Sequence, residues 1–408
     1  MADDDRARNG RAELEDALEL PFEPMELQMG PSHPAMHGTV KIVLKLDGET
    51  IVGSDVEVGY LHRGFEKEAE SSLYYQVFPY TDRLNYSSPM INNVGYALAV
   101  EKLFGISVPE RGNYVRVIAS EVSRMTDHFT CLGAAAMELG AMTAFLYAVE
   151  ARDQLWDLLD AMCGARVTCN YVRIGGVSHD LGPDFPGLAR EKLAKAAALH
   201  KDLEDLLLAN PVFRERMEGT GVLGPDELIA YGVTGPLLRA AGVPYDVRAA
   251  QPYLVYDRLD FDVPIGEHGD NFDRFIVRCE ELRQSARMIE QCLAAMPEGP
   301  VDVDDAKIRW PGKNRVFNRM EELIAQFKLV TEGMKPPVGE VYQAVEGGNG
   351  ELGFYLVSDG SGKPYKCRCR SPSFSNTQPL SRMIQGKMLA DVVPTFDMIN
   401  MIGGECDR

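Results

Sequence analysis

The longest hydrophobic pattern in the chain extends from about residue 120 to residue 166 and predicts helix. Along it, apolar or small side chains recur at alternating steps of three and four residues, at Val122, Met125, Phe129, Leu132, Ala136, Leu139, Thr143 and Leu146. This spacing places them on one face of a helix, as in a packed bundle. We expect the helix to be interrupted near Ala151.

Part of this pattern, residues 129–149, is long enough to cross a bilayer and contains one charged residue, Glu138. Its Ala and Gly content and the charges at both ends favour a helix buried in a soluble bundle over a membrane span. A lone carboxyl group in apolar surroundings must find a partner or stay protonated. Glu138 is therefore a functional candidate or half of a structural ion pair.

Shorter patterns complete the prediction of secondary structure. Helices are expected at residues 66–78, 90–104, 188–209 and 272–293. The alternating stretches 40–46 and 50–58, joined by Asp47-Gly48, predict a β-hairpin. Further strands are expected at 341–345, 354–357 and 365–370. Together these elements predict an α+β protein with a helical bundle core and small β-sheets near both chain ends.

We expect a flexible acidic tail at residues 1–24 and a single domain at residues 25–408. Within that domain, an N-terminal β-hairpin region would cover about 25–65, a helical core about 66–335 and a mixed C-terminal region about 336–408. No secretory signal is expected, because the N-terminus is acidic where such a signal would be basic.

The charge of the chain narrows its partners. The sequence holds 61 acidic and 42 basic residues, a net charge of −19. Such a surface repels phosphate backbones and anionic lipid headgroups, so we expect no nucleic acid partner, and membrane contact only through an intermediary.

The eight cysteines form no C-x-x-C pair, so no iron–sulfur or zinc framework is predicted. Their scattered positions suggest the reducing cytoplasm. Cys367 and Cys369 are the one close pair, and their strand-like alternation favours buried thiols over a metal site. No dinucleotide loop, phosphate loop or hydrolase nucleophile elbow is present, so NAD(H) binding by this chain is not expected.

Several polar segments could carry chemistry. In Gly30–Gly38, His33 and His37 lie four residues apart, but Pro34 and the glycines favour a loop over a helical metal pair. The loop 80–89 contains Tyr86, which could donate a phenolic proton or cap the loop onto the core. Taken singly, each segment also fits a purely structural role.

In combination and in this order, the segments resemble one family closely, the D-type subunit of complex I, equivalent to the chloroplast H-type subunit. The stretches that carry the resemblance are 30–38, 59–67, 80–86, 96–103, 121–124, 170–177, 261–267, 339–342, 370–374 and 404–408. The resemblance covers roughly residues 25–408. It implies the fold of nickel–iron hydrogenase large subunits without the metal, because the nickel-ligand positions are here Asn85, Ser88, Ile399 and Ile402.

The resemblance also implies roles for individual residues. In the family, positions matching Tyr86 and His37 contact the quinone headgroup, and a carboxylate matching Glu138 is the partner of that histidine. Arg63 matches an arginine near the terminal iron–sulfur cluster of a neighbouring subunit. The chain itself would bind no metal or cluster, quinone would be the substrate, and NAD(H) would be used elsewhere in the complex.

The implied setting is the cytoplasmic side of the inner membrane. There the chain would be attached through other complex I subunits, especially the iron–sulfur-bearing B-type, the C-type and the membrane H-type quinone-channel subunit. A relative of complex I fed by ferredoxin or reduced deazaflavin, and a non-catalytic scaffold, are the alternatives. A nickel–iron hydrogenase would need cysteines that this sequence lacks.

The sequence departs from the family pattern at three places. The carboxylate is usually aspartate, whereas here it is Glu138. A histidine linked to a pH-dependent cluster potential is replaced by Thr168, and a Thr-Pro pair by Thr143-Ala144.

Overall fold

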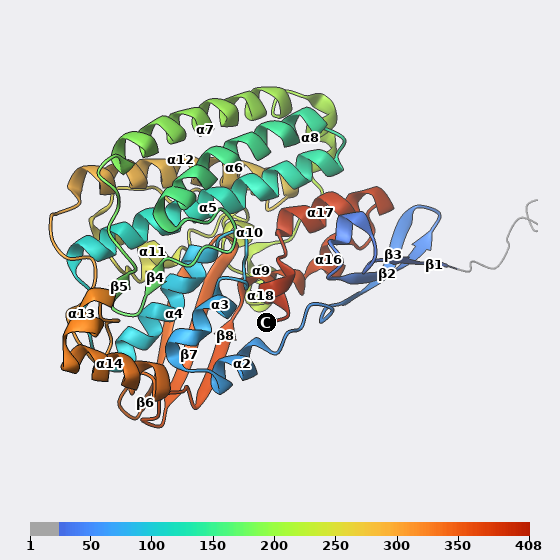
Figure 1. Ribbon diagram of the computed structural model, residues 1–408. Coiled ribbons are helices and arrows are strands. Elements are labelled where there is room, and N and C mark those ends of the chain that lie inside the picture. Colours follow the sequence, from blue (N-terminus) through green and yellow to red (C-terminus); the bar gives the residue numbers. More distant parts are fainter. Residues whose placement is uncertain (1–23) are drawn as a thin grey trace, which may run out of the picture.

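The computed structural model describes residues 24–408, so nearly all of the expected acidic tail lies outside the described residues. Four long helices run side by side as a layer, α5 (Glu110–Glu138), α6 (Met142–Cys163), α7 (Phe185–Leu207) and α12 (Asn271–Ala295) (Figure 1). Beneath them lies α4 (Pro89–Phe104), which packs on the C-terminal sheet. The expected α+β architecture with a helical core is confirmed.

Small antiparallel sheets lie at both chain ends, as predicted. The N-terminal sheet has the order β1 (Met25–Met29), β2 (Lys41–Asp47) and β3 (Thr50–Glu57). The C-terminal sheet has the order β6 (Gly339–Gly347), β7 (Gly350–Ser358) and β8 (Lys366–Arg370). A two-stranded ribbon joins β4 (Val172–Arg173) to β5 (Gly176–Val177). The strand β1 was not predicted, because it is five residues long and mostly exposed.

Short helices fill the connections between these layers. They are α2 (Phe65–Ser71), α3 (Phe78–Thr81), α8 (Pro211–Met217), α9 (Pro225–Ala230), α10 (Pro236–Arg239), α11 (Val247–Ala250), α13 (Lys313–Asn318), α14 (Met320–Thr331), α15 (Pro372–Thr377), α16 (Leu380–Ile384), α17 (Val392–Ile399) and α18 (Gly403–Cys406). Single 3₁₀ turns lie at Pro34–Met36, Tyr74–Val77, Tyr256–Arg258 and Leu389–Asp391. A single domain over residues 25–408 stays a prediction.

Two expected helix boundaries were wrong. The long helical pattern breaks at residues 139–141, between α5 and α6, and not near Ala151, which is buried inside α6. Gly140, with a φ of 84°, makes the turn there, and glycine adopts this conformation without steric cost. The predicted helix 66–78 ends at Ser71 and continues as separate short turns, because the chain leaves the helical conformation at Ser72. Among residues 24–408, no helix is long and apolar enough to span a bilayer.

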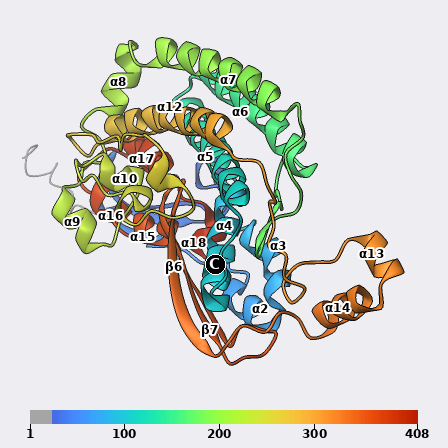
Figure 2. The same cartoon turned by 90° about the vertical axis from the view of Figure 1, so that its left-hand side faces the viewer.

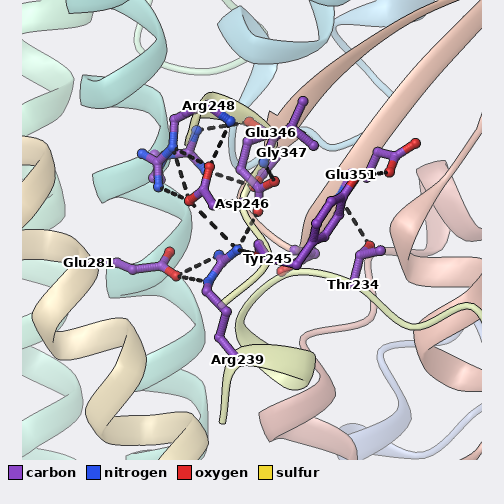
Figure 3. Close-up of polar contacts among 12 residues, drawn as sticks. Thr234, Arg239, Tyr245, Asp246, Arg248, Glu281, Glu346, Gly347 and Glu351 are labelled. Carbon is purple, nitrogen blue, oxygen red and sulfur yellow. Dashed lines mark hydrogen bonds and ion pairs between the residues drawn. The ribbon is translucent and has the colours of Figure 1, made fainter. Parts of the chain in front are cut away.

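A buried network of ion pairs joins α5, α10, α11, α12 and β6 (Figure 3). Arg239 lies at its centre and donates to Glu281 at 2.6 Å and to Glu346 at 2.8 Å. Arg248 donates to Asp246 at 2.6 Å and to Glu121 at 3.2 Å. All of these side chains are almost fully buried. Charges removed from water in this way stay in the protein only when each meets an opposite charge.

A second arginine connects the network to the backbone. Arg124 pairs with Glu121 and donates to the carbonyl oxygens of Glu346 and Gly347 at 2.8 and 2.7 Å. Burial favours the neutral form of Glu281, but Arg239 and His128 outweigh it and hold the Glu281 pKa well below its usual range. Helix α5 is thus fixed to the sheet by charge as well as by apolar packing.

We predict that Arg239→Leu lowers the free energy of unfolding by about 3–5 kcal/mol, because Glu281 and Glu346 lose a buried partner. Urea unfolding of the purified chain measures this change. The matched control is Arg166→Leu, whose pairs with Asp153 and Asp157 are solvent-exposed and should change the value by less than about 1 kcal/mol. Equal losses in the two variants would contradict the prediction.

Candidate functional site

The first histidine motif forms a loop, as its glycines and proline predict. His33 caps the 3₁₀ turn Pro34–Met36, and its Nδ1 accepts a hydrogen bond from the Ala35 amide at 3.2 Å. His37 ends that turn with a φ of 54° and reaches solvent. Its ring lies edge-on to Phe396 of α17, with centroids 6.1 Å apart. His33 therefore supports the loop, and His37 is presented to the outside.

Asn85 closes the loop that carries Tyr86. The Asn85 Oδ1 accepts hydrogen bonds from the amides of Ser87 and Ser88, and its Nδ2 donates to Asp127 at 2.8 Å. Tyr86 is 44% exposed, and its hydroxyl has no hydrogen-bond partner within residues 24–408. Loss of water and the nearby Asp127 raise the Tyr86 pKa, so the phenol keeps its proton. It is a free hydrogen-bond donor at the surface.

Asp127 of α5 joins three segments behind this surface. Its Oδ2 accepts from Asn85 at 2.8 Å and from Ser88 at 3.0 Å, and its Oδ1 accepts from Asn400 at 3.1 Å. A Cβ on Gly348 would lie 2.1 Å from the Asp127 Oδ2, so only glycine fits against it. Asp127 was not singled out in the sequence analysis, so this role was missed.

The four positions that the resemblance aligns with the nickel ligands of hydrogenases provide no thiolates. Asn85 and Ser88 are hydrogen-bond donors to Asp127, while Ile399 and Ile402 are buried aliphatic side chains. Neutral amide, hydroxyl and aliphatic groups do not suit a soft-ligand nickel site.

Glu138 is the last residue of α5, next to the turn at residues 139–141. It is half-buried and forms no side-chain hydrogen bond or ion pair with residues 24–408. Glu138 was expected in the middle of a helix buried in a bundle, whereas the helix ends at this residue and leaves its side chain partly exposed. Partial loss of water around the His37 ring lowers its pKa, and the charge of the nearby Glu138 opposes that shift. The two residues therefore lie close enough to interact electrostatically.

Asp397 of α17 is a second carboxyl group that the sequence reasoning missed. It is 4% exposed, and neither side-chain oxygen has a hydrogen-bond partner among the described residues. Burial, and then the nearby Glu138, raise its pKa well above the usual range. The signal in the sequence was similar to that for Glu138, a single charged residue in the segment 392–399.

Helix α17 brings these groups together. Phe396 contacts the His37 ring, Asp397 lies near Glu138, and Asn400 at the C-terminal end of the helix binds Asp127. The order of contacts along α17 therefore links the His37–Glu138 pair to the Asp127 contact behind Tyr86. Such a set of phenol, imidazole and carboxyl groups can bind an oxygen acceptor and supply protons to it.

Glu405, in the C-terminal motif, adds a further titrating group near Asp127. Burial raises its pKa to about 7, although hydrogen bonds from Ser373 oppose the shift.

Arg63 contacts the segment that carries Tyr86 and the C-terminal motif. Its guanidinium donates to the carbonyl oxygens of Arg83 at 2.7 Å and of Gly404 at 3.4 Å. Loss of water and the charge of Arg83 lower the pKa of Arg63.

Arg83 borders a hollow of about 480 Å³, which is also lined by Asp82, Thr168, Asn170 and Arg173. Burial raises the pKa of Asp82 to about 6 there, and the hydrogen bond from Asn170 opposes that shift.

The cysteine pair lies where the alternation predicted. Cys367 and Cys369 point the same way from β8 and are buried, which raises both thiol pKa values and keeps the thiols protonated.

A separate group of possible metal ligands, His200, Glu204 and Cys279, lies between α7 and α12. Its carboxylate is paired with Arg283 and burial raises the pKa of its thiol, while the His200 Nε2 has no hydrogen-bond partner among the described residues.

Comparison with known proteins gives consistent relatives. The sequence profile described as "Respiratory-chain NADH dehydrogenase, 49 Kd subunit" matches residues 138–408. A D-type subunit of NADH-quinone oxidoreductase from Sorangium cellulosum is 56% identical over 398 residues, which cover 97% of this chain and 98% of that protein. The D-type subunit of the same enzyme from Myxococcus xanthus is 51% identical over 384 residues, covering 94% and 92%.

The matched region includes Glu138, α17 and the C-terminal motif, and the full-length relatives extend the match across the loops of His37 and Tyr86. With identities above 50% over nearly the whole length, the chain belongs to the family of D-type subunits of NADH-quinone oxidoreductase, the 49 kDa subunit of complex I.

Proposed function

We propose that this chain binds the headgroup of a quinone between Tyr86 and His37 and supports its reduction within the complex. The observation that carries the proposal is the Tyr86 hydroxyl, a protonated donor that reaches solvent and has no partner within residues 24–408. A quinone oxygen is an acceptor that fits this donor. His37, presented to solvent by its turn, is the second group able to donate to the substrate.

Reduction of a quinone to a quinol takes up two electrons and two protons. Two oxygen atoms each gain a proton, so two donors are needed at the headgroup, and Tyr86 and His37 supply them. The electrons would come from an iron–sulfur cluster on the B-type subunit. Arg63 would lie near that cluster, where its positive charge favours the reduced form of the cluster. After His37 gives up its proton, Glu138 favours its reprotonation, since this carboxyl group raises the His37 pKa.

The apolar surroundings suit the tail of such a substrate. Met137 precedes Glu138 at the end of α5, Met142 and Leu146 lie in the first turns of α6, and all three side chains are exposed. We propose that this face meets the membrane H-type subunit, with the B-type and C-type subunits as the other principal neighbours. The chain would then sit on the cytoplasmic side of the inner membrane, attached through these partners, while NAD(H) is oxidised elsewhere in the complex.

We predict that Tyr86→Phe and His37→Ala each lower quinone reduction in assembled complex by at least about a hundredfold, because each removes a proton donor. NADH oxidation with an artificial electron acceptor should be retained. The control is Tyr231→Phe, which changes an equally exposed tyrosine on another element. Unchanged quinone reduction in both variants, with assembly verified by native gel, would instead favour a scaffold role.

Glu138→Gln should change the pH dependence of quinone reduction. Glu138 raises the pKa of His37, so its neutral replacement lowers that pKa further and leaves less imidazolium at a given pH. The alkaline limb of the activity profile should therefore move to lower pH. An unshifted pH profile would show that Glu138 does not influence the protonation of His37 during quinone reduction.

The free energy of unfolding of Asp397→Asn should exceed that of the wild type by a margin that grows as the pH rises. The folded-state pKa of Asp397 is raised above its ordinary value of 3.8, so its contribution is complete below that pH and is lost as the pH increases towards the folded-state pKa. Asparagine has no such loss. Thermal unfolding between pH 5 and about pH 8 should show the wild type falling relative to the variant. Parallel curves would refute this assignment.

A further inference from the structure

Helix α14 turns its apolar face towards solvent. Its exposed side chains are Met320, Leu323, Ile324, Phe327 and Val330, which share one face at helical spacing. Only Leu329 of this helix is buried. Phe317, on the preceding helix α13, is 84% exposed. A helix on the surface of a soluble protein normally turns such a stripe towards its core, so this arrangement is inverted.

The two helices form an arm that stands away from the helical layer (Figure 2). Its base is nevertheless well packed. Leu329 and Met334 belong to the main hydrophobic core, Trp310 packs edge-on against Tyr75 with ring centroids 4.9 Å apart, and Gly333 lies close against Gly362. The arm therefore holds its apolar face in a fixed position.

The charge of the arm is opposite to that of the chain. Residues 313–331, which form the arm, contain four Lys or Arg side chains and two Glu side chains, a net charge of +2, although the whole chain has a net charge of −19. Four exposed basic residues around the stripe form no ion pair with residues 24–408, and they are Lys307, Lys313, Arg319 and Lys328. A partner surface with carboxylates would complement them.

The stripe is flanked by two hollows. One of about 500 Å³ is lined by Phe104 and Ile324, by the basic residues Lys307, Lys328 and Lys335 and by the acidic residues Glu321 and Glu332, among others. The other, of about 610 Å³, lies between Trp310, Lys313, Phe317 and Gln326. Hollows beside exposed aromatic side chains accept protruding side chains of a partner protein, which is the usual form of the energetic centre of an interface.

We infer that the α13–α14 arm docks another complex I subunit through a surface that is apolar at its centre and acidic at its rim. A bilayer surface has no protruding side chains to fill the two hollows. Two arms that docked on each other would bring like charges together. An arm that docked on the acidic body of a second copy would make a head-to-tail contact, which does not close into a symmetric dimer. This inference rests on membership in complex I and not on the quinone site.

Photo-cross-linking in the purified complex tests the partner directly. With p-benzoylphenylalanine in place of Phe327, or separately of Phe317, illumination should give an adduct with an Asp/Glu-bearing peptide of a different complex I subunit. Mass spectrometry identifies the peptide. Adducts with lipid alone, adducts between two copies of this chain, or no adduct in intact complex would each overturn the inference.

Variants test the energetic role. Phe327→Asp should lower the fraction of this chain in assembled complex about tenfold, because a charge enters the centre of the interface. Lys328→Glu should weaken assembly most at low salt, where charge repulsion is least screened. The control is Ile229→Asp on α9, also exposed, which should assemble normally. Normal assembly of Phe327→Asp would overturn the inference, and in that case quinone reduction by Tyr86 and His37 would remain untouched.

Discussion

The structure depends on charges that have no access to water. Four carboxyl groups, on Glu121, Asp246, Glu281 and Glu346, meet three guanidinium groups, on Arg124, Arg239 and Arg248, in the centre of the molecule. Because the cost of dehydrating each charge is offset only by its partners, the elements that carry them cannot shift independently. The helical layer and the C-terminal sheet are therefore held in one fixed arrangement.

This arrangement also determines the geometry of the candidate site. Arg124 binds the carbonyl oxygens of Glu346 and Gly347, and the next residue, Gly348, packs directly against Asp127. Asp127 in turn holds the loop of Tyr86 through Asn85 and holds α17 through Asn400. The groups that we propose to face the substrate are thus positioned by a chain of contacts that begins in the ion-pair network, and they need few contacts of their own.

The sequence predicted the parts of the fold that follow from periodicity. The long helices and the strands of the C-terminal sheet were anticipated, because their apolar spacing is regular. The break between α5 and α6 was placed wrongly, because Gly140 interrupts a pattern whose hydrophobic spacing continues through it. His37, Tyr86 and Glu138 were noticed in their segments, and the resemblance supplied their roles. Asp127 and Asp397 were missed, because their roles arise from contacts between residues far apart in the chain.

The uninterrupted length of α5 has a consequence for how this protein can vary. Glu121 and Arg124, in the ion-pair network, and Glu138, at the tip, lie on the same helix. One residue inserted between them would rotate Glu138 by about 100° and move it by about 1.5 Å relative to the network. Substitutions along α5 can be absorbed locally, but insertions and deletions cannot. The spacing of fourteen residues from Arg124 to Glu138 therefore fixes the position and direction of Glu138 relative to the network. The number of residues in this segment is a stricter requirement than the identity of most of them.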